Sequence, residues 1–398
     1  MRANNIMQSY LMMAMVLCIV FACKKNEPPL QHATTFLKTY QTDSSANSQQ
    51  LFQMPDGGFI IISIEGAGYA GEPLMVRTDK YGNFRWKKTI QKHFPYNFSA
   101  VFQLSDGSFV AQQLNNFIKF DTLGNSKLLN ISPPGNLQCN AMTHLGSNII
   151  IPACGVFYAK DTINEVYVYD QSLNLLHTDS FYNGPLGGKP IGFFVNNVTS
   201  TGTCTILGEK YPRNNFNAGF DNYKLFAARI SVSGNTIQTI IDSGDQKYSD
   251  LAIQQLSTDD SGEVLLGSRY SSTISFPVVV RFDKNLNVAW YSQYSINTAS
   301  VTPNYVSACK DGGFIIAGSI QTTGTTYTQP YALKIDANGN KQWAKAITSS
   351  SIQGNGAFYS VTELGDGTLA FVGGSSQFGM GLVSNQILFI KTDANGNL

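Results

Sequence analysis

Residues 312–347 read GGFIIAGSIQTTGTTYTQPYALKIDANGNKQWAKAI, and the pattern of this stretch occurs seven times along the chain. Each copy has two landmarks, an Asp-Gly pair before an apolar run and a D-x-x-G-N motif before a further strand-like segment. The first landmark, degenerate in copies three and four, lies at Asp56-Gly57, Asp106-Gly107, Leu145-Gly146, Thr201-Gly202, Ser261-Gly262, Asp311-Gly312 and Asp366-Gly367. The second begins at Asp79, Asp121, Asp170, Ser231, Asp283, Asp336 and Asp393. When Thr34–Leu398 is divided equally among the seven copies, each repeat is about 52 residues long, which is enough for four short strands.

The seventh copy is incomplete. Residues 387–398 read ILFIKTDANGNL and stop before the segment that contains Trp343 in the sixth copy. The stretch TTFLKTY at 34–40 supplies the missing segment, with Phe36 in the phase of Trp343 and Lys38 in the phase of Lys345. Because a ring of repeats can close by sharing one repeat between the two termini, the sequence predicts an all-β fold. The predicted fold is a seven-bladed β-propeller of four-stranded blades, whose last blade is closed by the N-terminal strand, residues 34–41.

The landmarks have mechanical explanations. Asp366-Gly367 separates two strand-like runs and predicts a two-residue hairpin turn, because Asp and Gly tolerate a positive φ. The run Asp393-Ala394-Asn395-Gly396 predicts a type I turn with a left-handed glycine and a bulge. The tryptophans of the last segment of the repeat are expected to pack between blades rather than to form a cofactor cage; they are Trp86, Trp290 and Trp343.

The pattern resembles known repeat families. The runs VYVYD at 166–170 and YALKID at 331–336, followed by an aromatic strand, are similar to kelch and PQQ-like propeller repeats. The sequence pattern DGGFIIAGS…DANGNxxW also resembles repeats of lipoproteins and secreted proteins of Bacteroidetes-type bacteria. This resemblance implies the fold and leaves the function open, because propellers include both enzymes and inert platforms.

The first residues are expected to target the chain to the cell envelope. Residues 11–22 (LMMAMVLCIVFA) form an apolar segment of signal-peptide length, and Val20-Phe21-Ala22-Cys23 resembles a bacterial lipobox. The sequence therefore predicts a lipoprotein signal peptide at 1–22, a lipidated Cys23 with a tether at 23–33, and one propeller domain at 34–398. Ordinary cleavage and an uncleaved anchor are alternatives. The predicted location is the outer membrane, in either its surface or its periplasmic leaflet.

Charge and cysteine usage restrict the partners. The 398 residues carry a net charge of +1 and no basic run, so nucleic acid is not expected as a partner. Cys204 and Cys309 replace apolar residues of the repeat and are expected to be buried thiols. A disulfide between Cys139 and Cys154 is possible, but their spacing does not establish it.

The two predicted faces of the propeller differ. The Asp-Gly and D-x-x-G-N turns are short and share one face. The N-terminal strand is expected to begin at that face, so a lipid on Cys23 would hold this face toward the membrane. The other face carries long, variable connections, of which the longest is Glu209–Tyr223. Aromatic and polar side chains on such loops suit a glycan, a peptide or an envelope protein, although they could simply pin the loops to the blades. The candidate ligand-binding residues are Tyr211, Arg213, Asn214, Asn215, Phe216, Phe220, Asp221, Asn222, Tyr223, Tyr96 and Tyr182.

Signals for catalysis are weak. The four histidines have no metal-ligand spacing, and no cofactor is expected. Asp336 and Asp393 begin runs that superficially match a calcium loop, but the glycine comes too early and a hairpin turn is favoured. The sequence favours a non-enzymatic binding or scaffolding lipoprotein. A carbohydrate-active enzyme with acids at the channel mouth, Glu209 and Asp221 being the acids of the longest loop, is the first alternative. A quinone- or metal-dependent enzyme is the second.

Overall fold

A computed structural model describes residues 35–398 of the chain. It leaves out 44–45, 67–70, 91–99, 114–115, 130–136, 140–142, 146–147, 156–163, 171, 173, 182–187, 197–202, 213–223, 232–240, 244–251, 258–261, 272–273, 297, 348–354 and 377–385. The described residues contain strands and turns but no helix, and hence no helix that could cross a membrane. All of them belong to one compact unit, Thr35–Leu398.

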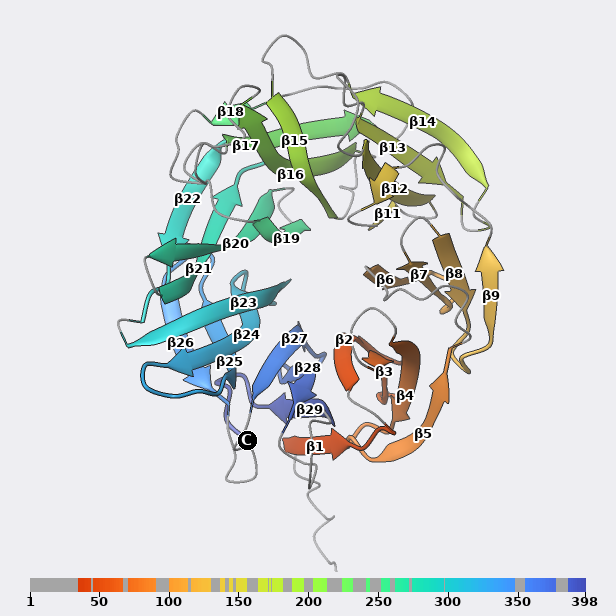
Figure 1. Ribbon diagram of the computed structural model, residues 1–398, viewed down its shortest axis with the longest axis vertical. Coiled ribbons are helices and arrows are strands. Elements are labelled where there is room, and N and C mark those ends of the chain that lie inside the picture. Colours follow the sequence, from red (N-terminus) through yellow and green to blue (C-terminus); the bar gives the residue numbers. More distant parts are fainter. Residues whose placement is uncertain are drawn as a thin grey trace, which may run out of the picture. The chain divides into compact units, whose positions relative to one another are not determined.

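Within these residues the strands form seven antiparallel sheets (Figure 1). The first sheet contains β2 (Ala46–Gln53), β3 (Phe59–Glu65), β4 (Glu72–Thr78) and β5 (Phe84–Thr89). The second contains β6 (Ala100–Gln103), β7 (Phe109–Gln113), β8 (Asn116–Phe120) and β9 (Ser126–Leu129). The third contains β10 (Leu137–Cys139), β11 (Thr143–Leu145), β12 (Asn148–Gly155), β13 (Asn164–Tyr169) and β14 (Leu175–Phe181). The next three contain β15 (Gly188–Asn196), β16 (Thr203–Pro212), β17 (Lys224–Ser231) and β18 (Ile241–Ser243); β19 (Ala252–Ser257), β20 (Glu263–Ser271), β21 (Ile274–Phe282) and β22 (Val288–Gln293); and β23 (Ala299–Ala308), β24 (Phe314–Thr322), β25 (Gln329–Ile335) and β26 (Lys341–Ala346). The last contains β27 (Gly356–Glu363), β28 (Leu369–Ser375), β29 (Gln386–Thr392) and β1 (Phe36–Tyr40). Six of these sheets are four-stranded as predicted, whereas the third has five strands because β10 and β11 both pair with β12.

The N-terminal strand β1 completes the last sheet. It pairs antiparallel with β29, so that the two ends of the described chain lie side by side in Figure 1. Phe36 stands opposite Lys391 just as Trp343 stands opposite Lys334 in the β23–β26 sheet. The predicted phase of Phe36 is therefore confirmed, and β1 takes the place of the missing fourth strand.

Both kinds of short turn lie at the same end of a sheet. In the β2–β5 sheet, Gln53 pairs with Phe59, Phe59 with Thr78 and Thr78 with Phe84, which places the two turns side by side. We call this end of each sheet the short-turn edge. Phe36 at the start of β1 lies near the same edge of the last sheet, because its partner Lys391 almost directly precedes the Asp393 turn.

The Asp-Gly turns differ from the predicted two-residue hairpins. Met54 accepts a hydrogen bond from the Gly57 N–H and donates its own N–H to the Gly58 carbonyl, so three residues separate the bonded pair. Only Gly57 has a positive φ, of 79°. This is a type I turn followed by a glycine bulge, and it has the same geometry as the D-x-x-G-N turns. The prediction for the latter is confirmed, because Gly82 donates its N–H to Asp79 at a φ of 71°.

Apolar side chains fill the space between successive sheets. The second and third strands of the repeat are buried along nearly their whole length, as in β28 and β29. Strands with both faces covered read as continuous apolar runs, which explains the runs in the sequence. The rings of Phe52 and Phe109 join the β2–β5 and β6–β9 sheets at 4.9 Å between centroids, and those of Phe117 and Tyr169 join the next pair at 6.4 Å.

The remaining pairs of successive sheets are also in contact. Strand β12 contacts β15, β15 contacts β19, β19 contacts β23 and β23 contacts β27. Phe59 of the first sheet packs against Phe389 of the last sheet at 5.0 Å between ring centroids. Each described sheet thus contacts the next one in sequence, and the last contacts the first.

The cysteine predictions have different outcomes. Cys309 is a buried free thiol, as expected, and burial raises its pKa to about 12. Cys204 lies in β16, but its side chain is outside the described part of the structure. Cys139 stands opposite Ala153, and Cys154 opposite Gln138, so the backbone register does not pair the two cysteines directly.

Candidate binding surfaces and the structural acids

Most of the predicted ligand-binding residues fall outside the described residues. This applies to the lipidation candidate Cys23, to Tyr96 and Tyr182, and to the whole of 213–223, which contains Arg213, Asn214, Asn215, Phe216, Phe220, Asp221, Asn222 and Tyr223. Tyr211 is placed by its backbone alone, in β16 opposite Lys189 of β15. Their role in binding stays a prediction.

The bounds of the longest predicted loop need correction. Strand β16 continues through Pro212, so 209–212 pair with β15 and do not belong to a loop. Strand β17 begins at Lys224, as the sequence suggested. The repeat pattern ended this strand too early because Lys210 and Tyr211 continue a strand-compatible segment with no turn residue before Pro212. The connection between the two strands is therefore 213–223.

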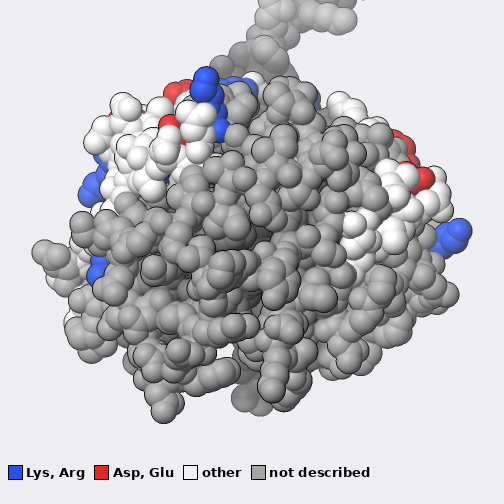
Figure 2. Space-filling model, turned by 90° about the horizontal axis from the view of Figure 1, so that it is seen from above, with Lys and Arg blue, Asp and Glu red and all other residues white. Residues whose placement is uncertain are grey.

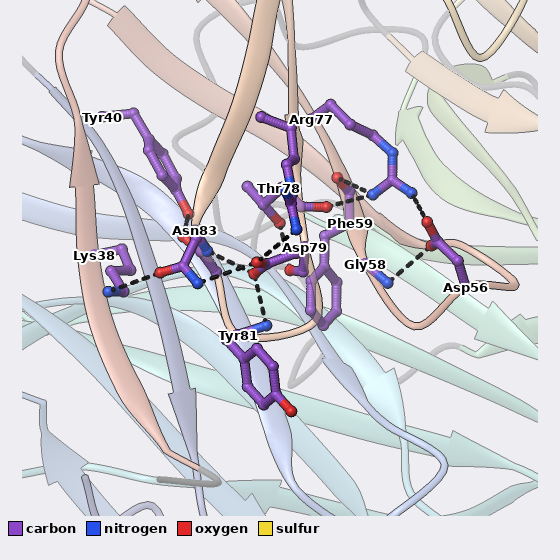
Figure 3. Close-up of polar contacts among 12 residues, drawn as sticks. Lys38, Tyr40, Asp56, Gly58, Phe59, Arg77, Thr78, Asp79, Tyr81 and Asn83 are labelled. Carbon is purple, nitrogen blue, oxygen red and sulfur yellow. Dashed lines mark hydrogen bonds and ion pairs between the residues drawn. The ribbon is translucent and has the colours of Figure 1, made fainter. Parts of the chain in front are cut away.

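The D-x-x-G-N turns account for their own acids. The Oδ1 of Asp79 accepts hydrogen bonds from the N–H groups of Tyr81 and Asn83 at 2.9 and 2.8 Å, and its Oδ2 accepts one from the Asn83 side chain at 3.0 Å (Figure 3). Asp336 and Asp393 make the same three contacts in their own turns. These hydrogen bonds confirm the hairpin-turn interpretation of the two runs that resemble a calcium loop.

The acids of the Asp-Gly turns have a different partner. Asp56 binds Arg77 of β4 at 2.5 Å, and Arg77 also donates to the Phe59 carbonyl at 3.1 Å (Figure 3). The same ion pair joins Lys119 to Asp106, Lys334 to Asp311 and Lys391 to Asp366, at 3.0, 2.7 and 3.0 Å. Each pair ties the first turn of a sheet to its third strand. The basic residue before the second landmark is thus structural, a role that the sequence analysis missed although the residue recurs there.

The electrostatics of these acids oppose a catalytic role. The Arg77 side chain holds the pKa of Asp56 below its usual value. The Ser108 hydroxyl, together with the Lys119 ammonium group, lowers the pKa of Asp106 to about 2, against a smaller opposing effect of burial. A general acid at neutral pH needs the opposite shift, because it must keep its proton until it meets its substrate. These carboxylates are permanent hydrogen-bond acceptors.

Aromatic residues of the outermost strands pack against the neighbouring sheet. The Trp290 ring of β22 lies over Gly339 in the next sheet, where an added Cβ would approach the ring to 2.8 Å. Trp343 lies over Gly396 and Phe36 over Gly82 in the same manner. The prediction that the tryptophans pack between sheets is therefore confirmed for Trp290 and Trp343. Glycine is needed in these turns for its positive φ and also for its missing side chain.

Polar groups of the same strands clamp the same turns. Lys345 donates to the Asn395 carbonyl and to the Asn397 side chain at 2.6 Å each, and Lys88 makes the equivalent bonds to the turn at Leu123 and Asn125. Tyr294 donates from its hydroxyl to the Gly339 carbonyl at 2.8 Å. The sequence analysis aligned Lys38 with Lys345 but assigned this role to no lysine, because the partner turn belongs to the following repeat.

A cavity of ≈ 540 Å³ opens between the Asp-Gly turns of the first two sheets. Its lining comes from two copies of one motif: Gln53, Met54, Pro55 and Gly57, and Gln103, Leu104, Ser105 and Gly107. The lining has amide, hydroxyl and apolar groups but no ionisable side chain. It can accept a neutral polar molecule, whereas it contains no group for acid–base chemistry.

In the view of Figure 2, the Lys and Arg atoms of the described residues are interspersed with those of Asp and Glu.

No protein-family model matches the chain, and no curated protein does. Solved structures with similar folds do exist. Puromycin hydrolase matches at a TM-score of 0.57 and 11% identity, over 90% of this chain and 55% of its own. An extracellular domain assigned to the one component system BT4673 of B. thetaiotaomicron matches at 0.51 and 11% identity, over 90% of this chain and 40% of its own. A β-propeller domain of the Trilobed protease of Pyrococcus furiosus matches at a TM-score of 0.46 and 10% identity, over 89% of this chain and 95% of its own.

The first two similarities show a shared all-β fold. At such low identity they carry no activity over to this chain. The chain spans about half of puromycin hydrolase and two fifths of the BT4673 domain, so it corresponds to a part of each.

Proposed function

We propose that this protein is a cell-envelope lipoprotein whose seven-bladed β-propeller binds a glycan, peptide or protein ligand without catalysing a reaction. The ligand would contact the long-loop face, which lies opposite the short-turn edge. The observation that carries the proposal is that the turn carboxylates bind backbone N–H groups or basic side chains of their own sheet. Those of Asp56, Asp79, Asp106, Asp311, Asp336, Asp366 and Asp393 are all engaged in turns or ion pairs. Rigid turns below variable loops suit a binding scaffold.

Closure of the ring is supported by the contacts between sheets. Seven sheets are described, each contacts the next, and β1 joins the last sheet to the N-terminal part of the chain. The closing interface also has the clamp found inside the chain, because the Tyr40 hydroxyl donates to the Gly82 carbonyl at 2.7 Å (Figure 3). A propeller closed in this way has no free sheet edge between its first and last blades.

Anchoring by lipid on Cys23 gives this scaffold an orientation. Strand β1 begins at the short-turn edge, and residues 24–33 can span at most about 35 Å when fully extended. The short-turn edge would then face the membrane and the long loops would point away from it. The extracellular assignment of the similar BT4673 domain is compatible with a location outside the cytoplasm. The expected partners are thus a membrane, through the lipid, and an envelope ligand, with no nucleic acid among them.

Two experiments test the proposal. Metabolic labelling with palmitate should mark the full-length protein expressed with its leader, and Cys23→Ala should abolish the label. Retention of the label in that variant would disprove lipidation at Cys23.

Binding is tested with the mature chain from Lys24 onward on glycan and peptide arrays. A hit should disappear when 213–223 is replaced by a short Gly-Ser linker, and it should survive shortening of the connection between β24 and β25, which is the matched control. Binding that survives removal of 213–223 would eliminate this loop as the ligand site. Turnover of an array glycan by the same preparation would instead favour a carbohydrate-active enzyme.

A further inference from the structure

The large apolar side chains that are exposed in the described residues are distributed unevenly. They are Phe84 at 51%, Leu123 at 63%, Leu175 at 47%, Leu176 at 50%, Tyr327 at 40%, Tyr359 at 36% and Leu398 at 49%. Five of these seven lie in a D-x-x-G-N turn or its equivalent, or within two residues after it. We call Phe84, Leu123, Leu175, Leu176 and Leu398 the apolar arc. They occupy the outer part of the short-turn edge.

The apolar arc belongs to sheets that neighbour one another. Leu398 follows the turn of the last sheet, Phe84 that of the first, Leu123 lies in the turn of the second, and Leu175 follows the turn of the third. These four sheets contact each other in that order, through the ring pairs Phe59–Phe389, Phe52–Phe109 and Phe117–Tyr169. The exposed side chains therefore follow one continuous part of the rim.

The same turn positions are different in the β23–β26 sheet. Asn338 occupies the position of Leu123, and Lys341 the position of Phe84; both are exposed and polar. In the β19–β22 sheet the corresponding Val288 is half-buried. The turn geometry therefore does not require exposed apolar residues. Among the turns whose exposure the structure describes, those of the β19–β22 and β23–β26 sheets lack them.

Cations flank the arc beside Phe84. Arg85 exposes 62% of its side chain even though it binds Asp79 at 3.2 Å. Lys80 is exposed and lies 5.0 Å from the centroid of the Tyr81 ring. Figure 3 shows the Tyr81 side chain pointing away from the hydrogen bonds of its turn. Aromatic and aliphatic side chains next to Lys and Arg are the combination that binds the interface of a bilayer.

We propose that the apolar arc contacts the surface of a phospholipid bilayer. This proposal rests on the proposed function, which attaches a lipid ahead of β1 and so brings the short-turn edge toward the membrane. Leu398 lies in the sheet that β1 completes, and Phe84 packs beside Tyr40 of β1 with 6.4 Å between ring centroids. The arc is thus next to the strand that leads from the anchor. The contact would hold the propeller in a fixed, tilted orientation and present one part of the long-loop face outward.

The test uses the unlipidated mature chain, so that its result does not depend on lipidation. The mature chain keeps every strand of the described sheets, since the first of them begins at Phe36. Cosedimentation is measured with vesicles of equal parts phosphatidylethanolamine and phosphatidylglycerol, and with vesicles of phosphatidylcholine alone. We expect measurable binding, stronger to the anionic vesicles because of Lys80 and Arg85.

The decisive variant is Leu123→Asp, with Asn338→Asp as its matched control. Both add one carboxylate at the same turn position, and Leu123 is exposed, so neither change disturbs a core. Leu123→Asp should lower the partition coefficient about tenfold, because a leucine side chain leaves the lipid interface, while Asn338→Asp should change it less than twofold. Equal effects of the two variants, or no vesicle binding by the unmodified chain, would overturn the proposal. The second outcome would leave a protein partner as the occupant of the arc. Failure of lipidation would appear only in the palmitate experiment.

Discussion

Trp290 donates a hydrogen bond from Nε1 to the carbonyl oxygen of Ala337 at 3.0 Å, from one sheet to the short turn of the next. Its ring covers Gly339 of the same turn. The contact joins residues 47 positions apart, one in the outermost strand of a repeat and the other in the D-x-x-G-N turn of the next repeat. It shows how consecutive repeats hold together, because outermost strands such as β22 and β26 contact a turn of the next sheet.

Replacement of Trp290 by Phe should remove this hydrogen bond and keep most of the ring contact. We expect a loss of about 1–2 kcal/mol in the free energy of unfolding, from one hydrogen bond and a slightly smaller ring. Urea denaturation followed by circular dichroism measures it. A variant as stable as the unmodified protein would show that the indole N–H contributes nothing to the interface.

The glycine beneath the tryptophan should be less replaceable than other glycines with the same backbone. Gly339 and Gly107 both have a φ of 80°, but an added Cβ would meet Trp290 at 2.8 Å in the first case and nothing within 4 Å in the second. Gly107→Ala should cost about 1 kcal/mol through backbone strain alone, and Gly339→Ala clearly more. Equal melting temperatures of the two variants would refute the role of the ring contact.

The closing interface can be compared with an internal one. Tyr40 and Tyr294 both donate a hydroxyl hydrogen bond to a turn glycine of the next sheet, at 2.7 and 2.8 Å. Burial raises the pKa of both phenols, that of Tyr294 to about 12. If β1 closes the ring as an ordinary fourth strand, Tyr40→Phe and Tyr294→Phe should each lower the free energy of unfolding by about 1 kcal/mol. A loss at Tyr294 alone would indicate that the closing contact is not formed in solution.

Leu286 replaces the glycine of the fifth D-x-x-G-N motif and keeps its positive φ, at 64°. It is 1% exposed and packs in a cluster with Phe282 and Val280. Leu286→Gly would relieve about 1–2 kcal/mol of backbone strain but would lose a buried leucine worth about 2–5 kcal/mol. We therefore expect net destabilisation of about 1–3 kcal/mol by chemical denaturation. A stabilised variant would mean that the strain outweighs the packing.

Stability should fall in acid through the turn carboxylates. The folded-state pKa of Asp106 is about 2, below its ordinary value of 3.8. A lowered pKa stabilises the fold above the ordinary value, and this contribution is lost as the pH falls from about 4 toward 2. Asp106→Asn should lower the urea midpoint near neutral pH and reduce its dependence on pH in the acid range. An unchanged pH dependence would show that Asp106 is not stabilised as an anion in the folded state.

Much of the fold could be predicted from local pattern. The D-x-x-G-N turns, the phase of Phe36 and the burial of Cys309 followed from alignment of the copies, because turn chemistry and apolar runs act over a few residues. The Asp-Gly turn was predicted with the wrong loop length, since the sequence does not show that only its glycine takes a positive φ. The end of β16 was also misplaced, because strand pairing with β15 extends it to Pro212.

Contacts between repeats could not be predicted from one copy at a time. The partners of Lys88, Lys345 and Trp290 lie in the following repeat. Within one repeat, the ion pair of Asp56 with Arg77 joins a turn to the third strand of the same sheet, 21 residues further along the chain. The apolar arc became visible only when exposure was known, because Leu123 and the buried Leu286 occupy adjacent positions of the same motif.

The sequence by itself determined the repeat, its turns and the division of one repeat between the two ends of the chain, since these depend on local backbone preferences and on apolar periodicity. Only the tertiary structure decided which side chains clamp the neighbouring sheet and which remain exposed at the rim. Those properties depend on surfaces that meet only after the sheets have packed together.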